Sequence, residues 1–529
     1  MLTALLTCVT LTLQAQINTY QKILEADLGE GRVMTTMSNG DVVLGARHSD
    51  FMANVNAVQL VRFDATGQVL WGRKLSNAAD PTDYLVLNDV AHAANGDILL
   101  CGSHGYGTQG DSAFVIRTDG AGSVLWAKNF KASGTGVLRS RALRVREAPN
   151  TDVVVLGETD LDNGGLESRM HITRFNTGGT VLWTKDVVAQ IFGTGQLAGD
   201  VRFPPDGGML VFGQTLLLTE GSWLMRLNDA GNKLWVRQLN TNANGLSLEP
   251  VRLFPTSAGY DLFYHSEFTG FTSMLYRIRT DTTGTVLAAQ QYDVASGDGY
   301  ANDVTALPGG GYAVAGWSDA QSSGLAVLFT LDASGQTQWA MDYGGGDYEH
   351  LNTVAPTGDG GFLLAGTGIR DSLELRGGTP VNTYLVKTDG SGISSYCETQ
   401  DVVTGSSTNF ASIASDLDMN NITGWADATY NNDPGVNAVD VCVVSTVPEH
   451  AAARMQIQPN PTRDSAVIHW GASPVDRVLL LDMTGRVVLI AHASGTRTDL
   501  DLGQLAPGTY LVLATNAGMP VVQARLVRL

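Results

Sequence analysis

Short apolar runs alternate with polar turns along most of the chain. Each run has four to eight residues, which suits a β-strand and is too short for an ordinary helix. One stretch shows the pattern well, with four apolar runs at Leu87–Ala91, Asp97–Cys101, Ala113–Thr118 and Ser123–Phe130. The pattern therefore predicts short antiparallel strands joined by turns.

A turn-and-aromatic signature recurs along the chain. Each unit has an Asp or Asn, a Gly three residues later, and four residues after that a position that opens a strand. These positions are Trp71, Trp126, Trp183, Trp235, Ala288 and Trp339, which are 51 to 57 residues apart. The Gly that closes an earlier strand repeats in step at Gly45, Gly102, Gly157, Gly213, Gly316 and Gly366, with His265 in the fifth unit. The two markers together indicate seven units.

Four short strands at this period are typical of a β-propeller blade. A blade has two apolar faces and buries them only by stacking against its neighbours around an axis. The sequence therefore predicts an all-β fold, a seven-bladed β-propeller over residues 17–396. Tyr20 to Leu24 match the fourth strand of a unit without the first three. We expect this strand to complete the seventh blade beside Tyr384 to Lys387 and to close the ring.

Two side-chain patterns recur with the repeat. The tryptophans have the period of the fold, and we expect them to pack between blades rather than to bind sugars. A basic residue stands two positions after the aromatic at Lys22, Arg73, Lys128, Lys185 and Arg237. Because Lys and Arg on an outermost strand discourage edge pairing, we interpret these residues as edge protection.

Three further segments flank the repeats. Residues 1–16 include the apolar run Leu2 to Leu13 followed by Ala15, which is typical of a secretory signal peptide. Residues 397–449 are polar and predict a linker, or a loop closed by a disulfide between Cys397 and Cys442 in an oxidising compartment. Residues 450–529 hold short β-like runs at the spacing of a small Ig-like β-sandwich.

Charge and missing motifs exclude several classes. The chain has 33 Lys plus Arg and 52 Asp plus Glu, a net charge of −19, which gives no electrostatic reason to bind nucleic acid or an anionic membrane. After the signal peptide, no apolar stretch approaches the ~18 residues that span a bilayer. The nine histidines form no zinc motif, and no phosphate loop or nucleophile elbow occurs. We expect a secreted monomer without a transmembrane segment or nucleic-acid partner.

Three aspartates form the candidate site. Asp89, Asp200 and Asp303 occupy equivalent places on the strand predicted to be innermost in its blade. In a closed ring their carboxylates would converge near the central channel and suit a calcium ion or a polyhydroxylated ligand. The alternative is that each carboxylate accepts hydrogen bonds from backbone amides in its own turn. Apart from such a calcium ion, we expect no cofactor.

Three motifs near the C-terminus carry a family resemblance. They are Pro459-Asn460-Pro461, the segment Leu481–Val488 with Gly485, and the segment Leu502–Leu511 with Pro507, Gly508 and Tyr510. In this order and spacing they resemble the type A C-terminal sorting domain of the Bacteroidetes type IX secretion system. The resemblance implies a cargo that crosses the inner membrane by its signal peptide and the outer membrane by the type IX machinery. The sorting domain is then usually removed, and the cargo is released or attached to surface lipopolysaccharide.

The repeat region also resembles the secreted propeller-like proteins that precede such sorting domains. A rigid ring with loops suits a non-enzymatic binding or adhesion module for extracellular glycan or protein. The alternative is an extracellular propeller enzyme that acts on polysaccharide or is a quinone-dependent oxidoreductase. The oxidoreductase rests on Asp64 to Trp71, which resembles the tryptophan-docking motif of pyrroloquinoline quinone dehydrogenases. That family usually has eight blades and often an adjacent cysteine pair, which this sequence lacks. A His, Glu or Arg cluster in one channel mouth would favour an enzyme.

Overall fold

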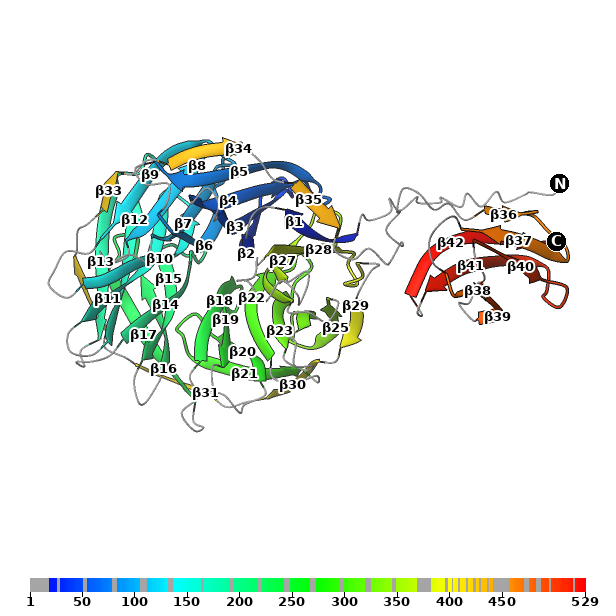
Figure 1. The fold of residues 1–529 in the computed structure, drawn as a ribbon. Coiled ribbons are helices and arrows are strands. Elements are labelled where there is room, and N and C mark those ends of the chain that lie inside the picture. Colours follow the sequence, from blue (N-terminus) through cyan, green and yellow to red (C-terminus); the bar gives the residue numbers. More distant parts are fainter. Residues whose placement is uncertain are drawn as a thin grey trace, which may run out of the picture. The chain divides into compact units, whose positions relative to one another are not determined.

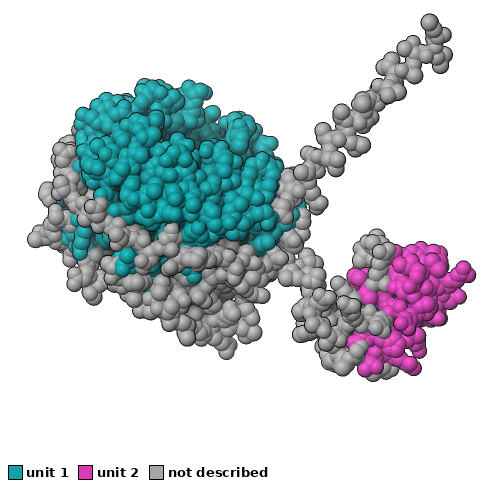
Figure 2. All heavy atoms as spheres, turned by 90° about the horizontal axis from the view of Figure 1, so that it is seen from above, with its two compact units in different colours: residues 1–442 teal, residues 443–529 magenta. Residues whose placement is uncertain are grey.

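The computed structural model describes most of the chain as β-structure. The described residues are 19–25, 29–50, 55–78, 83–104, 112–131, 137–162, 166–189, 195–216, 221–241, 248–266, 273–294, 299–318, 325–344, 349–368, 382–394, 398–401, 403–407, 410–414, 417–421, 425–427, 430–434, 437–440, 456–470, 475–481, 487–493, 496–516 and 519–529. They divide into two compact units, residues 1–442 and 443–529 (Figure 2). No helix long and apolar enough to cross a membrane occurs among them. The predicted signal peptide, residues 1–16, lies outside them.

The first unit contains seven antiparallel sheets around a common centre (Figure 1), and we number these blades in chain order. Blade 1 contains β2 (Gly29–Thr36), β3 (Val42–Asp50), β4 (Val55–Phe63) and β5 (Val69–Asn77). Blade 2 contains β6 (Leu85–His92), β7 (Ile98–His104), β8 (Ala113–Thr118) and β9 (Val124–Phe130). Blade 3 contains β10 (Val137–Glu147), β11 (Val153–Asp162), β12 (Leu166–Phe175) and β13 (Val181–Ala189). The first strand of each blade is its innermost.

The remaining blades repeat this order. Blade 4 contains β14 (Gly195–Arg202), β15 (Met209–Leu216), β16 (Gly221–Leu227) and β17 (Lys233–Thr241). Blade 5 contains β18 (Leu248–Thr256), β19 (Gly259–Ser266), β20 (Ser273–Thr280) and β21 (Val286–Val294). Blade 6 contains β22 (Gly299–Ala306), β23 (Tyr312–Ser318), β24 (Leu325–Leu331) and β25 (Thr337–Tyr343). Blade 7 contains β26 (His350–Pro356), β27 (Phe362–Gly368), β28 (Asn382–Thr388) and the N-terminal strand β1 (Tyr20–Glu25).

The N-terminal strand closes the ring. Strand β1 pairs antiparallel with β28, with Ile23 opposite Tyr384. Seven hydrophobic clusters lie between neighbouring blades, and one of them joins blades 7 and 1 through Phe63 and Leu385. The prediction of a seven-bladed propeller closed by its first strand is confirmed.

The tryptophans pack between blades, as predicted. Trp126 of blade 2 donates from Nε1 to the carbonyl of Thr177 in blade 3, at 2.9 Å. A Cβ added to Gly179 would lie 2.7 Å from Cδ2 of Trp126, and this glycine has a φ of +82°, so both the turn and the contact require glycine. The same contact joins Trp71 to Gly122, Trp183 to Gly231, Trp235 to Gly284 and Trp339 to Gly392. This contact explains why Gly and Trp recur together.

A fifth strand lies on the outer edge of every blade, and we call these seven strands the belt (Figure 1). Its members are β29 (Glu398–Asp401) on blade 6, β30 (Val403–Ser407) on blade 5, β31 (Phe410–Ala414) on blade 4, β32 (Leu417–Asn421) on blade 3, β33 (Trp425–Asp427) on blade 2, β34 (Tyr430–Pro434) on blade 1 and β35 (Asn437–Asp440) on blade 7. The belt therefore passes the blades in reverse chain order and ends on the neighbour of the blade where it began.

The belt corrects two predictions. The linker predicted for residues 397–449 is wrong for the described residues between 398 and 440, which form strands, whereas the disulfide predicted between Cys397 and Cys442 stays a prediction. The interpretation of the recurrent basic residues as edge protection is also wrong, because Arg73 lies opposite Pro434 and Lys22 opposite Asp440 in paired strands. An outermost strand is held by backbone hydrogen bonds to an existing edge, so its side chains need not alternate between apolar and polar. The sequence therefore lacks the pattern by which such a strand would be predicted.

The second unit contains two sheets with a shared core, as expected of a sandwich. One sheet holds β36 (Gln456–Gln458), β37 (Ser465–His469) and β40 (Arg497–Asp501). The other holds β38 (Arg477–Leu481), β39 (Val487–His492), β41 (Gly508–Asn516) and β42 (Met519–Arg528). Buried Ile468 and Val512 belong to one cluster with Trp470, which lies directly after β37.

Candidate binding site in the central channel

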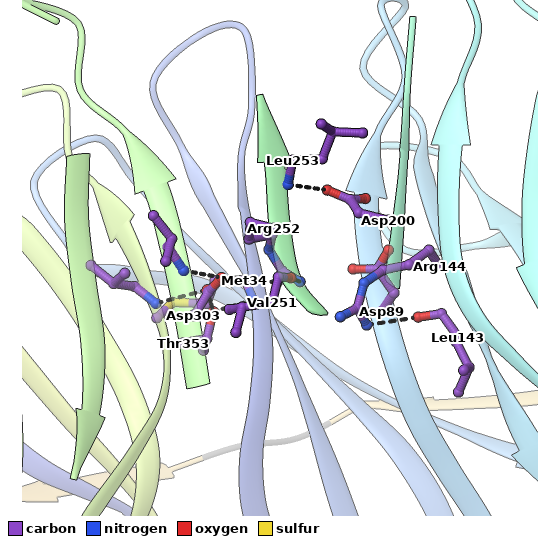
Figure 3. Close-up of polar contacts among 12 residues, drawn as sticks. Met34, Asp89, Leu143, Arg144, Asp200, Val251, Arg252, Leu253, Asp303 and Thr353 are labelled. Atoms are coloured by element: carbon purple, nitrogen blue, oxygen red, sulfur yellow. Dashed lines mark hydrogen bonds and ion pairs between the residues drawn. The ribbon is translucent and has the colours of Figure 1, made fainter. Parts of the chain in front are cut away.

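Every innermost strand carries a β-bulge at the same place, and the residue after the bulge defines a channel position. A bulge inserts one extra residue and changes the direction of the next side chain. The seven channel positions are Val33, Asp89, Arg144, Asp200, Arg252, Asp303 and Thr353. From blade 2 to blade 6 they alternate between Asp and Arg, and Figure 3 shows these residues close together in the channel.

The three predicted aspartates all occupy channel positions, and each joins two blades. Asp89 accepts a hydrogen bond from the amide of Val145, Asp200 from Leu253, and Asp303 from Val354, at 3.0, 3.4 and 3.2 Å. In each case the amide belongs to the innermost strand of the next blade. Asp200 and Asp303 also accept the amide of the following residue in their own strand. All three carboxylates thus accept backbone amides, but the amide common to all three belongs to the neighbouring blade and not to the aspartate's own turn.

Arginines neutralise the same carboxylates. Arg146 pairs with Asp89 and lies 3.1 Å from Asp200, which also pairs with Arg202 at 2.9 Å. Arg252 pairs with Asp303 at 2.9 Å. Burial alone would raise the pKa of Asp200, but Arg202 and Arg146 lower it to about 2. Asp200 is therefore ionised, and all three carboxylates are already paired with arginines.

This arrangement does not fit calcium. Calcium takes six to eight oxygen ligands, whereas these carboxylates face guanidinium groups. Within the part of the chain that the structure describes, no group of three or more His, Cys, Asp or Glu residues is placed to hold a metal ion. The channel residues suit a ligand that accepts hydrogen bonds.

Two cavities lie in the channel among the residues that the structure describes. The wide cavity, of about 600 Å³, is lined by the innermost strands of all seven blades, and Arg146, Arg202 and Arg252 border it. The narrow cavity, of about 240 Å³, is bordered by Arg32, Arg144 and Arg252. Arg252 is thus the arginine shared by the two.

Two further pairs of residues line the wide cavity, one titratable and one aromatic. His92 lies 3.3 Å from the hydroxyl of Thr35, and burial lowers the pKa of its imidazole despite the nearby carboxylate of Glu147. Glu147 accepts the amide of Ala94 at 2.6 Å. Phe203 and Phe254 are partly exposed in the same wall, and the guanidinium of Arg202 lies 5.5 Å from the ring centre of Phe254.

Sequence reasoning found the aspartates and missed Arg144 and Arg252. The signal was present, because Leu143-Arg144-Val145 and Val251-Arg252-Leu253 have the same position in their units as Asn88-Asp89-Val90. A search for aspartates alone overlooks a structural position that holds Asp in one blade and Arg in the next.

The other candidate residues that the structure describes do not line the cavities of the channel. Cys397, Cys442 and Gly485 lie outside the described residues. Cys101 is buried in the cluster between blades 2 and 3, as expected of a small apolar residue. In the second unit, Asn460 between Pro459 and Pro461 accepts the amide of Val527 at 2.9 Å. Tyr510, after Pro507 and Gly508, donates to the carbonyl of Ala506 at 2.6 Å.

These turns belong to the region that matches a known family. The family model described as a secretion system C-terminal sorting domain matches residues 456–527. Residues 456–527 are a sorting domain. The three motifs of the sequence lie within it, and it marks the chain as a type IX cargo destined for secretion and the cell surface. A comparison with curated proteins found no match.

Several solved structures are similar to two thirds or more of the chain. A protein of unknown function from Dyadobacter fermentans has 12% identity and a TM-score of 0.37, and the match covers 70% of this chain and 97% of that one. PorZ, a surface component of the type IX secretion system of Porphyromonas gingivalis, has 9% identity and a TM-score of 0.29, with 96% and 99% covered. A sialidase from Streptococcus pneumoniae has 13% identity and a TM-score of 0.35, with 69% and 68% covered.

Proposed function

We propose that the propeller is an extracellular binding module that takes part of a glycan into the wide cavity. The observation that carries this proposal is the cavity of about 600 Å³, bordered by arginines that already pair with carboxylates. Its volume lies in the range of ligand sites, roughly 300 to 1,000 Å³. After export, the sorting domain is removed and the propeller is displayed or released.

The wall chemistry favours a sugar over an apolar ligand. Arg202 has 26% of its side chain exposed and offers guanidinium donors to hydroxyl or carboxylate oxygens. Phe203 and Phe254 supply apolar surface for a pyranose ring. The guanidinium donors belong to strands that ion pairs connect to neighbouring blades. They are therefore held in position before a ligand binds.

The carboxylate of Asp200 offers little for acid catalysis. A general acid near neutral pH needs a raised pKa, whereas the pKa of Asp200 is lowered to about 2. We prefer binding to catalysis because the pKa of Asp200 is lowered, whereas a general acid needs a raised one.

A polysaccharide-active enzyme is the second candidate, because His92 and Glu147 share the cavity with the arginines. Burial lowers the pKa of His92, so its imidazole is neutral near pH 7 and could accept a proton. Incubation with acidic polysaccharides, followed by an assay for reducing or unsaturated ends, tests this candidate. New ends that disappear in His92→Gln would favour the enzyme.

The binding proposal is tested with the full chain and a panel of neutral and uronic-acid polysaccharides by calorimetry. We expect binding that weakens at least about tenfold in Arg202→Gln, from the loss of charged hydrogen bonds. Arg237→Gln is the control, because Arg237 lies on the outer strand β17 beside Trp235. The proposal is wrong if no polysaccharide binds or if Arg202→Gln binds as tightly as the parent protein.

A further inference from the structure

The narrow cavity contains an arginine without an ionic partner. Arg144, at the channel position of β10, donates from Nη1 to the carbonyl of Leu143 at 2.9 Å (Figure 3). Among the described residues, no carboxylate lies within ion-pair distance of it. Its Nε atom is buried without a hydrogen-bond partner there.

The other arginines of the cavity are paired. Arg32 lies 3.0 Å from Glu30, and Arg252 lies 2.9 Å from Asp303. The lining of the narrow cavity thus includes three arginines and one glutamate, Glu30, and Asp303 behind Arg252 supplies a second negative charge. Arg32 and Arg252 each have a paired carboxylate, whereas Asp89 and Asp200 attract Arg144 only from beyond ion-pair distance.

A charge without a paired carboxylate is costly when it is taken out of water, since it needs an opposite charge or hydrogen bonds to replace hydration. The pKa of Arg144 is lowered, first by burial and then by the like charge of Arg252, despite attraction from Asp89 and Asp200. The folded protein therefore holds a guanidinium that an anion would stabilise.

We propose that the narrow cavity binds a single oxyanion, with Arg144 as its main ligand and Arg252 beside it. The ligand is a carboxylate, phosphate or sulfate group. A volume of about 240 Å³ is below the range of drug-sized sites, so the cavity suits a small ion or one acidic group of a larger molecule. The site does not depend on the proposed glycan site, although Arg252 borders both cavities.

The test uses the full chain in a buffer free of multivalent anions. Sodium phosphate, sodium sulfate and sodium glucuronate are titrated separately, with sodium chloride at matched ionic strength as the reference. We expect at least one oxyanion to bind and to raise the melting temperature above the chloride reference. A response to glucuronate identifies the carboxylate of an acidic sugar as the source, and a response to phosphate or sulfate alone identifies a free inorganic ion.

Two matched variants remove one channel arginine each. Arg144→Gln should weaken oxyanion binding at least about tenfold, as expected for lost charged hydrogen bonds. It should also raise the melting temperature in anion-free buffer, because the variant removes a guanidinium that has no paired carboxylate. Arg202→Gln, in the wide cavity, should leave oxyanion binding unchanged while it weakens polysaccharide binding. If Arg144→Gln does not fold, Arg144→Lys keeps the charge without the planar fork and should weaken binding.

Three results would overturn the site. They are no response beyond chloride in the parent protein, equal oxyanion affinity in the Arg144 variant, or a lowered anion-free melting temperature in soluble Arg144→Gln. If the parent protein binds an oxyanion but no polysaccharide, the proposal for the wide cavity fails and this site stands.

Discussion

The inner and outer edges of each blade are built from the same repeat but make different kinds of contact. At the outer edge, all seven blades receive a belt strand through backbone hydrogen bonds. At the inner edge, the channel position changes from Asp to Arg to Thr or Val between blades. Backbone pairing tolerates almost any sequence, whereas charged side chains must match their neighbours. The outer edge is therefore suited to holding the ring together and the inner edge to recognition.

Removing the belt should have the largest effect. A chain that ends at residue 396 leaves seven outer edges unpaired, and we expect aggregation or a melting temperature lower by more than about 10 °C. A chain that ends at residue 442 loses only the second unit and is the matched control. Size-exclusion chromatography and thermal unfolding compare the two. Equal stability would show that the belt contributes nothing to the ring.

Removing an arginine from the ion pairs of the inner edge should have the second largest effect on stability. Arg146→Met leaves the buried carboxylates of Asp89 and Asp200 without their shared cation, which should cost about 3 to 5 kcal/mol of unfolding free energy. Arg237→Met on the outer strand β17 removes only an arginine beside Trp235, and should cost less than about 1 kcal/mol. Denaturant unfolding measures both. Similar losses for the two variants would contradict the contrast between the edges.

A cysteine stands beside each end of the belt, so a disulfide between the two ends can be tested. Cys397 directly precedes β29 on blade 6, and Cys442 follows β35 on blade 7 by two residues. Because blades 6 and 7 are neighbours, we predict a disulfide that closes the belt and stabilises the fold by about 3 kcal/mol. Cys397→Ser and Cys442→Ser should each lose this stability, and the double variant should lose no more. Thiol titration that finds both cysteines free in the unreduced protein would refute the pairing.

The repeat was predictable because its signals are local. The turn between Asp64 and Gly67 and the packing of Trp126 against Gly179 each depend on a few residues, and they recur in chain order. The closing strand was also predictable, because Tyr20 to Leu24 keep the apolar pattern of a fourth strand without the strands that should precede it.

The belt and the charge pairing were not predictable for a shared reason. A belt strand such as Glu398–Asp401 is specified by an edge that another part of the chain provides, so its own sequence carries no alternation. Likewise, Asp200 looked like a metal ligand because its partners Arg146 and Arg202 are known only once neighbouring strands are placed. Sequence reasoning located the position and could not assign its partners.

The smallest expected effect concerns acid stability at the inner edge. Asp200 has a pKa of about 2 in the folded protein, against about 3.9 for an ordinary aspartate, so the unfolded chain binds its proton first as the pH falls. The stability from this ionised carboxylate is therefore present above about pH 4 and is lost as the pH approaches 2, by about 2 to 3 kcal/mol in total. Asp200→Asn should flatten unfolding free energy in this window, measured by denaturant titration at each pH. Asp332→Asn, at an exposed outer turn, should change the slope less, because solvent screens that carboxylate. An equal change in both variants would mean that the acid response does not distinguish the inner edge from the outer one.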